Sequence, residues 1–213
     1  MEDPAHSKMK TNFDQVMVSL SAVSLPPILH DFPWSRYANA TVVDVGGGIG
    51  HVTAAVLSAN PSFNGVVFDL EKGIEGAKLF LPASYPEAYP RISLVKGSFF
   101  ESVPSGGDVY ILKYILHDWS DDNAVKILQT VAQALKETQQ SSSKRPSVLI
   151  IEHLYDFPPV HSHVAFMDMV MVGILGKERS QAEFEAIMQK AGLKPVQVHS
   201  TRSLITILEA QLV

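Results

Sequence analysis

The segment Thr41–His51, which reads TVVDVGGGIGH, constrains the fold more than any other part of the sequence. Its first part is rich in valine, and Ile49, Val52 and Val56 follow at helical spacing. A β-branched run followed by a helical pattern predicts a strand and then a helix, so the glycines must form the turn between them. Glycine permits positive φ angles and lets a ligand approach the backbone. Because the first amides of a helix carry a partial positive charge, the segment predicts a ligand-binding turn.

The spacing of the glycines indicates which ligand to expect. A dinucleotide-binding turn has the pattern G-x-G-x-x-G, whose third glycine allows the helix to pack closely on the strand. Counting from Gly46 and Gly48 places His51 at that third position, which argues against a pyrophosphate ligand. The pattern is instead D-x-G-x-G-x-G, from Asp44 to Gly50. It resembles the first motif of class I S-adenosylmethionine (SAM) dependent methyltransferases.

The chemistry of SAM agrees with this pattern. SAM has no phosphate but carries a sulfonium, an ammonium and a carboxylate, so Asp44 can serve the cationic part while the turn amides meet the carboxylate. About 20 residues beyond the turn, Asp69 ends another apolar run, where a carboxylate can accept hydrogen bonds from two ribose hydroxyls. The residues alone leave open a glycine-rich turn without a ligand, in which Asp69 only caps a helix.

Composition limits the class of partner. The chain has 213 residues and a net charge of −5, and no cluster of Lys and Arg interrupts this acidic average, so we expect no nucleic acid and no membrane partner. It contains no cysteine, which excludes disulfides and thiolate metal sites, and we expect no metal ion. No apolar run at the N-terminus is long enough for a signal peptide or a membrane span, so we expect a cytoplasmic protein.

From residue 41 onward, apolar strand-like runs alternate with helical stretches, a pattern typical of α/β folds with crossover helices. The last two runs are joined only by Ser200–Ser203, which is too short for a parallel crossover, so they should pair as a hairpin. We therefore predict an α/β, Rossmann-like SAM methyltransferase fold: a mainly parallel seven-stranded sheet with a C-terminal antiparallel hairpin and helices on both faces. The expected strands are 41–45, 65–70, 92–96, 109–115, 147–153, 195–199 and 204–208; the expected helices are 49–59, 73–80, 120–137, 161–172 and 180–191.

The chain is expected to divide into a helical lead-in, residues 1–40, and a methyltransferase domain, residues 41–213. Within the lead-in, apolar residues between 13 and 24 fall on one face of a helix, and Pro26 and Pro27 are expected to end that helix. Residues 139–146 (QQSSSKRP) are expected to form a flexible loop.

The carboxyl ends of the parallel strands mark the expected site. The run ILKYILHDWSDD is apolar through Leu116 and continues with His117, and Ser120 stands where a helix cap is expected, before an acidic first turn. His117 should therefore lie on the same edge of the sheet as the glycine turn. A histidine with a pKa near 6.5 is suited to accept a proton from a hydroxyl group at neutral pH. The alternative is a buried histidine with a structural role.

The motifs DVGGGIG, FDL, HDWSD and GKER occur in this order and resemble those of the catechol/caffeate-type small-molecule O-methyltransferases of plants and fungi, from Phe13 to the C-terminus. The resemblance implies that His117 is the general base. It also implies that Glu152 and Glu178 match the two acids that hold its imidazole, so the three are the catalytic candidates. A carboxylate bonded to one ring nitrogen fixes the tautomer and stabilises the imidazolium. Without the resemblance, Glu152 and Glu178 would be a strand-end acid and a solvated turn residue.

The resemblance also assigns contacts to the cofactor SAM. Ser98 stands where the family usually has an aspartate that accepts a hydrogen bond from adenine, and a neutral acceptor is weaker than a charged one. Phe99 can still stack on the base. The expected cofactor contacts are Asp44, Gly46, Gly48, Gly50, Asp69, Ser98, Phe99 and Lys113.

An apolar acceptor pocket is expected from Phe13, Met17, Met167 and Met171, because flexible methionine side chains suit flat aromatic ligands. Methionines at helical spacing are also common in cores. The family carries an N-terminal helical domain of roughly a hundred residues that dimerises and closes this pocket. We expect this domain to be absent here, so the chain would be a fragment or a short form that works as a homodimer or with a partner chain.

These observations predict a SAM-dependent O-methyltransferase that acts on a hydroxyl of a small aromatic or polyketide-like secondary metabolite, with His117 as base. Two alternatives remain open. The same fold can catalyse a rearrangement or cyclisation without methyl transfer, or it can be a catalytically silent binding or regulatory subunit. An NAD-dependent dehydrogenase is disfavoured because His51 replaces the third glycine.

Overall fold

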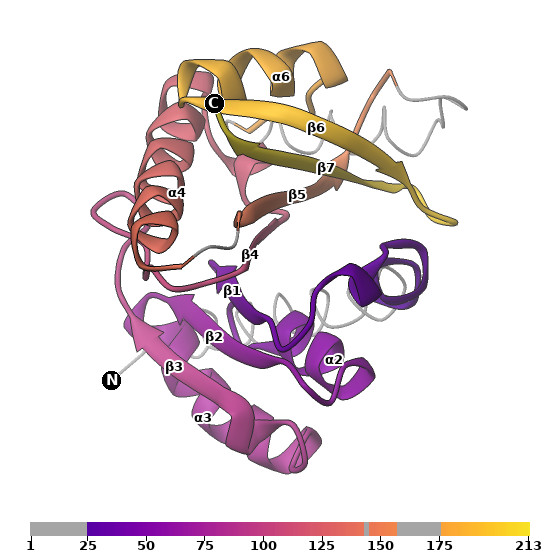
Figure 1. The fold of residues 1–213 in the computed structure, drawn as a ribbon, viewed down its shortest axis with the longest axis vertical. Coiled ribbons are helices and arrows are strands. Elements are labelled where there is room, and N and C mark those ends of the chain that lie inside the picture. The colour runs from indigo at the N-terminus through magenta and orange to yellow at the C-terminus, as the bar shows by residue number, and fades with distance from the viewer. Residues whose placement is uncertain (1–24, 143–144, 157–175) are drawn as a thin grey trace, which may run out of the picture.

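A seven-stranded sheet forms the centre of the protein (Figure 1). The computed structural model describes residues 25–142, 145–156 and 176–213. The strands are β1 (Thr41–Val45), β2 (Asn64–Asp69), β3 (Ile92–Lys96), β4 (Val109–Lys113), β5 (Ser147–His153), β6 (Leu193–Ser200) and β7 (Ile205–Leu212). Their order is β3-β2-β1-β4-β5-β7-β6. Strands β1 to β5 pair in parallel, whereas β7 is antiparallel to both β5 and β6. The predicted fold class is confirmed.

Helices cover both faces of this sheet (Figure 1). The α-helices with described bounds are α2 (His51–Ala59), α3 (Glu71–Ser84), α4 (Asp121–Ser141) and α6 (Gln181–Lys190), and short 3-10 helices are η1 (Trp34–Arg36), η2 (Tyr89–Arg91) and η3 (Leu116–Asp118). Helices α4 and α6 share one core with the strands, whereas α2 shares the other with the N-terminal segment. Helix α3 packs beside α2 through Ala77 and Leu81.

The alternation of side chains along each strand produces the two cores. In β1, Val43 and Val45 belong to the core under α4 and α6, whereas Val42 belongs to the core under α2. All three valines are fully buried. Because successive strand side chains point to opposite faces, an uninterrupted apolar run is what a sheet covered on both sides requires.

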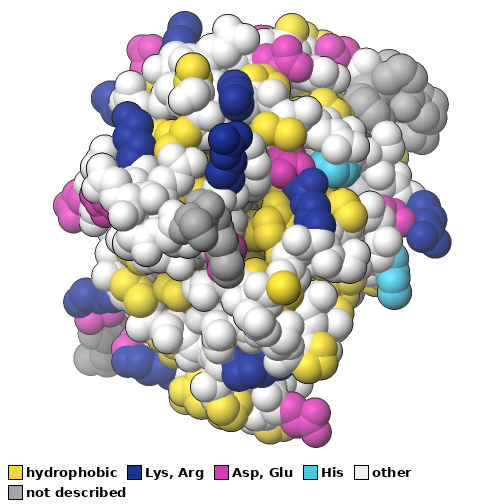
Figure 2. All heavy atoms as spheres, viewed as in Figure 1, with side chains coloured by type: hydrophobic (Ala, Val, Ile, Leu, Met, Phe, Trp, Pro, Cys, Tyr) yellow, Lys and Arg dark blue, Asp and Glu magenta, His cyan; other side chains and the backbone are white. Residues whose placement is uncertain are grey.

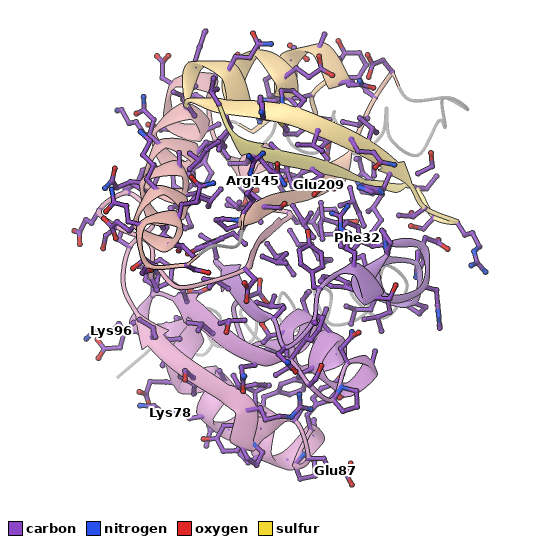
Figure 3. The ribbon with its side chains drawn as sticks, in the orientation of Figure 1. Phe32, Lys78, Glu87, Lys96, Arg145 and Glu209 are labelled. Carbon is purple, nitrogen blue, oxygen red and sulfur yellow. The ribbon has the colours of Figure 1, made fainter. Side chains whose placement is uncertain are left out.

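The N-terminal segment packs on the α2 side of the sheet. Residues 25–31 are helical, so Pro26 and Pro27 lie within a helical segment, whereas the helix that they were expected to end lies outside the described residues. The exposed Pro26 and half-buried Pro27 instead precede the buried Ile28, whose carbonyl oxygen accepts a hydrogen bond from Nε1 of Trp34 at 2.9 Å. The ring of Phe32, labelled with Glu209 in Figure 3, lies edge-on to His199 at 5.0 Å. The division of the chain into a helical lead-in, residues 1–40, and a methyltransferase domain, residues 41–213, stays a prediction.

Several element ends differ from expectation, each for a local reason. Helix α2 begins at His51 rather than Ile49, because Gly50 occupies the left-handed region with a φ of 80°. Strand β4 ends at Lys113, where Tyr114 has a φ of 53° and breaks the extended backbone. Helix α4 continues to Ser141, so the start of the expected 139–146 loop is helical. The helices expected at 13–24 and 161–172 lie outside the described residues.

The chain order of the strands places the site. From β1 the chain continues to β2 on one side, whereas β4, the other neighbour of β1, leads to β5 on the opposite side. Such a switch point leaves a crevice outside the carboxyl ends of the strands, which is where ligands bind in open α/β sheets. The glycine turn follows β1 and the His117 segment follows β4, so both lie at this switch point.

The surface agrees with a small-molecule ligand. On the face drawn in Figure 2, acidic side chains lie among the Lys and Arg side chains, and the described basic residues there do not form a continuous patch. Within the ranges that the structure describes, no helix is long and apolar enough to cross a membrane.

Candidate active site

The three alternating glycines have positive φ angles but different surroundings. Their φ values are +72° for Gly46, +56° for Gly48 and +80° for Gly50. A Cβ atom on Gly46 would lie 2.6 Å from Cδ1 of Ile115, and one on Gly50 would lie 2.9 Å from Cγ2 of Val67. A Cβ atom on Gly48 would meet nothing within 4 Å. Gly48 is therefore the position where the turn faces open space, whereas Gly50 allows α2 to approach β2 closely.

His51 packs among aromatic residues of α3 and the segment after it. Its ring stacks on Phe80 with centroids 5.7 Å apart and lies edge-on to Tyr85 at 5.8 Å. Gly50 thus performs the packing role that the third glycine has in dinucleotide-binding turns. This explains why a histidine is tolerated at the position that argued against a pyrophosphate ligand.

Asp69 binds the glycine turn directly. Its Oδ2 accepts a hydrogen bond from the amide of Gly48 at 2.7 Å, and its Oδ1 accepts one from the amide of Leu70 at 2.7 Å. A Cβ atom on Gly73 would lie 2.6 Å from the Asp69 carboxyl carbon, so the carboxylate is held from three sides. The structure therefore brings Asp69 to the open position of the turn.

Asp44 is buried against the glycine turn, where a Cβ atom on Gly47 would lie 2.7 Å from its carboxyl carbon. It is 2% exposed, and its Oδ2 accepts a hydrogen bond from Oγ1 of Thr53 at 2.8 Å. Burial raises the pKa of Asp44 to about 6, although the Thr53 hydrogen bond and the charge of Lys113 oppose this. Thr53 is a residue that sequence reasoning missed, because a threonine within a helix carries no distinctive signal.

The charge of Lys113 interacts both with Asp44, at the glycine turn, and with Glu152, near His117. Burial lowers its pKa to about 8, and the charges of Asp44 and Glu152 limit the decrease. Its Nζ lies 4.1 Å from the ring centroid of Tyr114. A half-buried cation between two buried carboxyl groups reduces the cost of keeping both of them out of water.

Ser98 and Phe99 lie in the loop after β3. A Cβ atom on Gly46 would lie 3.5 Å from Cε1 of Phe99, so this ring reaches the glycine turn. The Oγ of Ser98 accepts a hydrogen bond from the amide of Phe100 at 3.3 Å. The Ser98 hydroxyl is thus used by its own loop, where an aspartate would offer two acceptor oxygens.

His117 is surrounded by carboxyl groups. Its Nδ1 lies 3.3 Å from Oε1 of Glu178 and 3.6 Å from Oε2 of Glu152, and its Nε2 lies 3.6 Å from Oδ1 of Asp118. Oε1 of Glu152 accepts hydrogen bonds from the amides of Ile115 and Leu116, each at 3.0 Å. The structure therefore brings together the three catalytic candidates, His117, Glu152 and Glu178.

The charges of this group determine its protonation. Burial alone would lower the pKa of His117, but the charge of Glu152, the hydrogen bond that His117 donates to Glu178 and the charge of Asp118 raise it to about 9. Burial would raise the pKa of Glu178, but His117 and His153 lower it to about 2. Burial raises the pKa of Glu152. Glu178 is therefore the stable anion that pairs with the imidazole.

The GKER turn holds the backbone of the His117 segment. A Cβ atom on Gly176 would collide with the carbonyl oxygen of His117, and the amide of Lys177 donates to that oxygen at 2.9 Å. The fully buried Arg179 donates to the carbonyl oxygens of Leu116 and Trp119, each at 2.6 Å. Its Nε also donates to Asp121 at 2.9 Å. Sequence reasoning quoted Arg179 within the motif but missed its role, which a fully buried arginine reveals only in the fold.

Ile115 links the two halves of the site. Its side chain faces Gly46, and its amide donates to Glu152. The glycine turn and the acids that hold His117 are thus separated by a single residue. The residues expected to line the acceptor pocket, Phe13, Met17, Met167 and Met171, lie outside the described residues.

Two kinds of ligand are compatible with these groups. Gly48 and Asp69 border an open space that a side chain at position 48 would enter, which fits a cofactor held against the backbone. Nδ1 of His117 and one oxygen each of Glu152 and Glu178 lie within 4.8 Å of one another, so these three side chains have the spacing of a cation site as well as of a charged hydrogen-bond cluster.

Comparison with known proteins identifies the family. A family model described as an O-methyltransferase domain matches residues 3–194. Mitomycin biosynthesis 6-O-methyltransferase of Streptomyces lavendulae is 35% identical over 194 residues, which cover 91% of this chain and 51% of that protein. The chain spans about half the length of this curated relative.

Solved structures agree with this match. The structure of mitomycin 7-O-methyltransferase superposes with a TM-score of 0.86 at 32% identity, covering 100% of this chain and 59% of the other. An O-methyltransferase from neocarzinostatin biosynthesis, solved with SAM and 2-hydroxy-5-methyl naphthoic acid, gives a TM-score of 0.82 at 31% identity, covering 96% and 57%. With a sequence match that extends over most of its length and a shared fold, this chain belongs to the O-methyltransferase domain family.

Proposed function

We propose that this chain transfers the methyl group of SAM to a hydroxyl group of a small aromatic or polyketide-like secondary metabolite. The observation that carries the proposal is the position of Ile115 between the glycine turn and Glu152, because the glycine turn and a carboxylate-held imidazole then lie at one edge of the sheet. The relatives add support, since one is named for mitomycin and another was solved with a hydroxylated naphthoic acid.

When bound, SAM supplies an activated methyl group on a sulfonium. The residues of this chain have the remaining roles, which are to hold the cofactor and to accept the proton. Gly48 and Asp69 border the open space at the glycine turn, and Phe99 offers an aromatic face beside Gly46. His117 accepts the hydroxyl proton at Nε2, the ring nitrogen that faces away from Glu152 and Glu178. It does so in its neutral form, which the raised pKa makes the major form only above about pH 9. Glu178 keeps Nδ1 protonated and stabilises the imidazolium that forms, as a triad carboxylate does.

Replacing the base tests this proposal. His117→Ala is expected to abolish methylation of a hydroxylated naphthoic acid probe while SAM still binds, as measured by calorimetry, because the glycine turn and Asp69 are untouched. Full turnover in His117→Ala would show that the base is assigned wrongly. Turnover is also expected to survive a chelator such as EDTA, because the proton on Nδ1 takes the place that a cation would occupy among His117, Glu152 and Glu178.

The open alternatives give different results in the same assays. Mass spectrometry of the product is expected to show a gain of one methylene unit, whereas a rearrangement or cyclisation would leave the mass without that gain. A binding or regulatory subunit would show no turnover. Ser98 in place of an acid is the feature that favours these alternatives, because it weakens the expected adenine contact.

Further partners are part of the proposal. We propose that the acceptor pocket is completed by additional chain, belonging to this protein or to a second copy, because the relatives extend well beyond the matched region. The relationship to the catechol/caffeate-type O-methyltransferases and the cytoplasmic location stay predictions. Light scattering with the acceptor present would measure the oligomeric state that this requires.

A further inference from the structure

Tyr114 adopts a backbone conformation that tyrosine rarely adopts. Its φ is 53°, in the left-handed region, directly after the last residue of β4. Its amide donates to the carbonyl oxygen of Ile151 at 3.1 Å, so the backbone is fixed on the sheet. Positive φ in a bulky residue costs free energy and persists where surrounding contacts hold it, most often at functional sites. The contacts of the side chain are therefore informative.

The ring of Tyr114 lies flat against the imidazole of His117. The two ring centroids are 5.4 Å apart and the planes are inclined by 17°. Nζ of Lys113 lies 4.1 Å from the Tyr114 ring centroid. An aromatic face beside an imidazole favours ring angles that keep the two rings in contact, so it biases the rotation of the imidazole about its χ2 bond.

The hydroxyl of Tyr114 is held by a second histidine. It lies 3.2 Å from Nε2 of the buried His153. Burial, together with the charges of Glu152 and Glu178, raises the pKa of Tyr114, so the phenol keeps its proton and can donate it to Nε2. His153 then carries its own proton on Nδ1, which lies 3.7 Å from Oε1 of Glu178.

These contacts form a closed ring of four side chains. His117 meets Glu178 at 3.3 Å, Glu178 faces His153, His153 meets the Tyr114 hydroxyl, and the Tyr114 ring returns to His117. The members come from three separate segments of the chain. The two contacts of His117 act on different properties of its imidazole. Glu178 determines which ring nitrogen carries the proton, and Tyr114 limits the angle of the ring plane.

We propose that Tyr114 and His153 are positioning residues that hold the imidazole of His117 in the orientation needed to accept the substrate proton. The inference rests on the proposed function, since it concerns the base of that reaction. Tyr114 sets the plane of the imidazole by stacking, and His153 keeps Tyr114 and Glu178 in place. Neither residue needs to touch the substrate.

Paired substitutions at position 114 separate the stacking from simple packing. Tyr114→Phe keeps the aromatic face, so kcat is expected to stay within about threefold of wild type. Tyr114→Leu removes the face and is expected to lower kcat by about a hundredfold, a loss of the size that misplacement of a catalytic group causes, while the KM for SAM stays unchanged. His153→Gln is expected to lower kcat by about tenfold. Equal kcat in Tyr114→Leu and wild type would overturn the proposal.

His199→Gln is the matched control for loss of a buried histidine. His199 is 8% exposed and its Nε2 lies 3.0 Å from Oε2 of Glu209, labelled in Figure 3, so it resembles His153 in burial and in carboxylate contact. It lies on β6, two strands away from β5. His199→Gln is expected to lower the Tm but to leave kcat unchanged. A loss of kcat as large as that of His153→Gln would mean that general destabilisation explains both, and would contradict the proposal.

A spectroscopic measurement separates failure of this inference from failure of the proposed function. The Nδ1 proton of His117, held by Glu178, should give a downfield proton resonance in NMR that exchanges slowly with water. It should persist in Tyr114→Phe and broaden in Tyr114→Leu, whether or not turnover is detected. A sharp resonance in Tyr114→Leu would overturn the positioning role. Activity in His117→Ala would overturn the assignment of His117 as base, even if the resonance behaves as expected.

Discussion

Nδ1 of His117 lies 3.3 Å from Oε1 of Glu178, although 61 positions separate the two residues in the chain. Both side chains are buried, so the pair is shielded from solvent on most sides. A buried charge is tolerated only when it is paired, and here the imidazole and the carboxylate pair with each other. The protonation of His117 therefore depends mainly on Glu178 and its neighbour Glu152.

Glu178→Gln should change both the rate and the pH dependence of methylation. The amide keeps the shape but loses the charge of Glu178, which, together with Glu152 and Asp118, raises the pKa of His117 to about 9. The kcat is expected to fall by about a thousandfold, as when a triad carboxylate is neutralised. The rise of kcat/KM with pH should end at a lower pH than in wild type. Glu87→Gln, at the surface position labelled in Figure 3, is the control and should match wild type in both measurements.

Stability should depend on pH through His117. Its pKa in the folded state, about 9, lies above the ordinary value of 6.5, so its contribution to stability is fully present below pH 6.5 and is lost as the pH rises through 9. The free energy of unfolding, measured with urea, should fall by at most about 3 kcal/mol over this range. The decrease should be smaller in His117→Gln, and an identical decrease there would assign it to another group.

Gly48→Ala should prevent SAM binding at little cost in stability. An added Cβ meets no protein atom within 4 Å, so it would occupy only the space of the ligand. Gly106→Ala is the matched control, because Gly106 also has a positive φ, +93°, and open surroundings. Both variants should lose about 1 kcal/mol of stability through backbone strain. Only Gly48→Ala should weaken SAM binding in calorimetry; equal affinities in the two variants would place the cofactor elsewhere.

Arg179→Lys should destabilise the fold strongly despite keeping the charge. Lysine cannot replace the three directed hydrogen bonds to Leu116, Trp119 and Asp121, and buried carbonyl oxygens would lose their donors. We expect a loss of about 3 kcal/mol in urea unfolding. Arg202→Lys alters an exposed pair with Asp31 and should cost less than about 1 kcal/mol. Similar losses in the two variants would contradict the role of the buried guanidinium.

Ser98→Asp should strengthen SAM binding. The hydroxyl of Ser98 already accepts a hydrogen bond from its own loop, and a carboxylate would add a charged acceptor for an amino group of the ligand. We expect the Kd for SAM to fall by about tenfold. Ser98→Ala is the control and should leave the Kd within about twofold. An unchanged Kd in Ser98→Asp would mean that adenine does not reach this loop.

The sequence by itself determined the fold class and the order of the elements. Short valine-rich runs that are apolar on both faces and bounded by turn residues favour buried strands, and Ser200–Ser203 is too short for a parallel crossover. The glycine pattern likewise specified a turn after β1, and the structure has it there. These features are local, so periodicity and spacing are enough to predict them.

Only the tertiary structure decided which side chains meet. Nothing in the sequence indicates that Gly50 packs against Val67 while Gly48 faces open space, because the two glycines differ only in what the fold brings near them. The same holds for Tyr114, whose contact with His153 requires β4 and β5 to be neighbours. Side-chain contacts between distant segments depend on strand order and register, and a single sequence records neither of them directly.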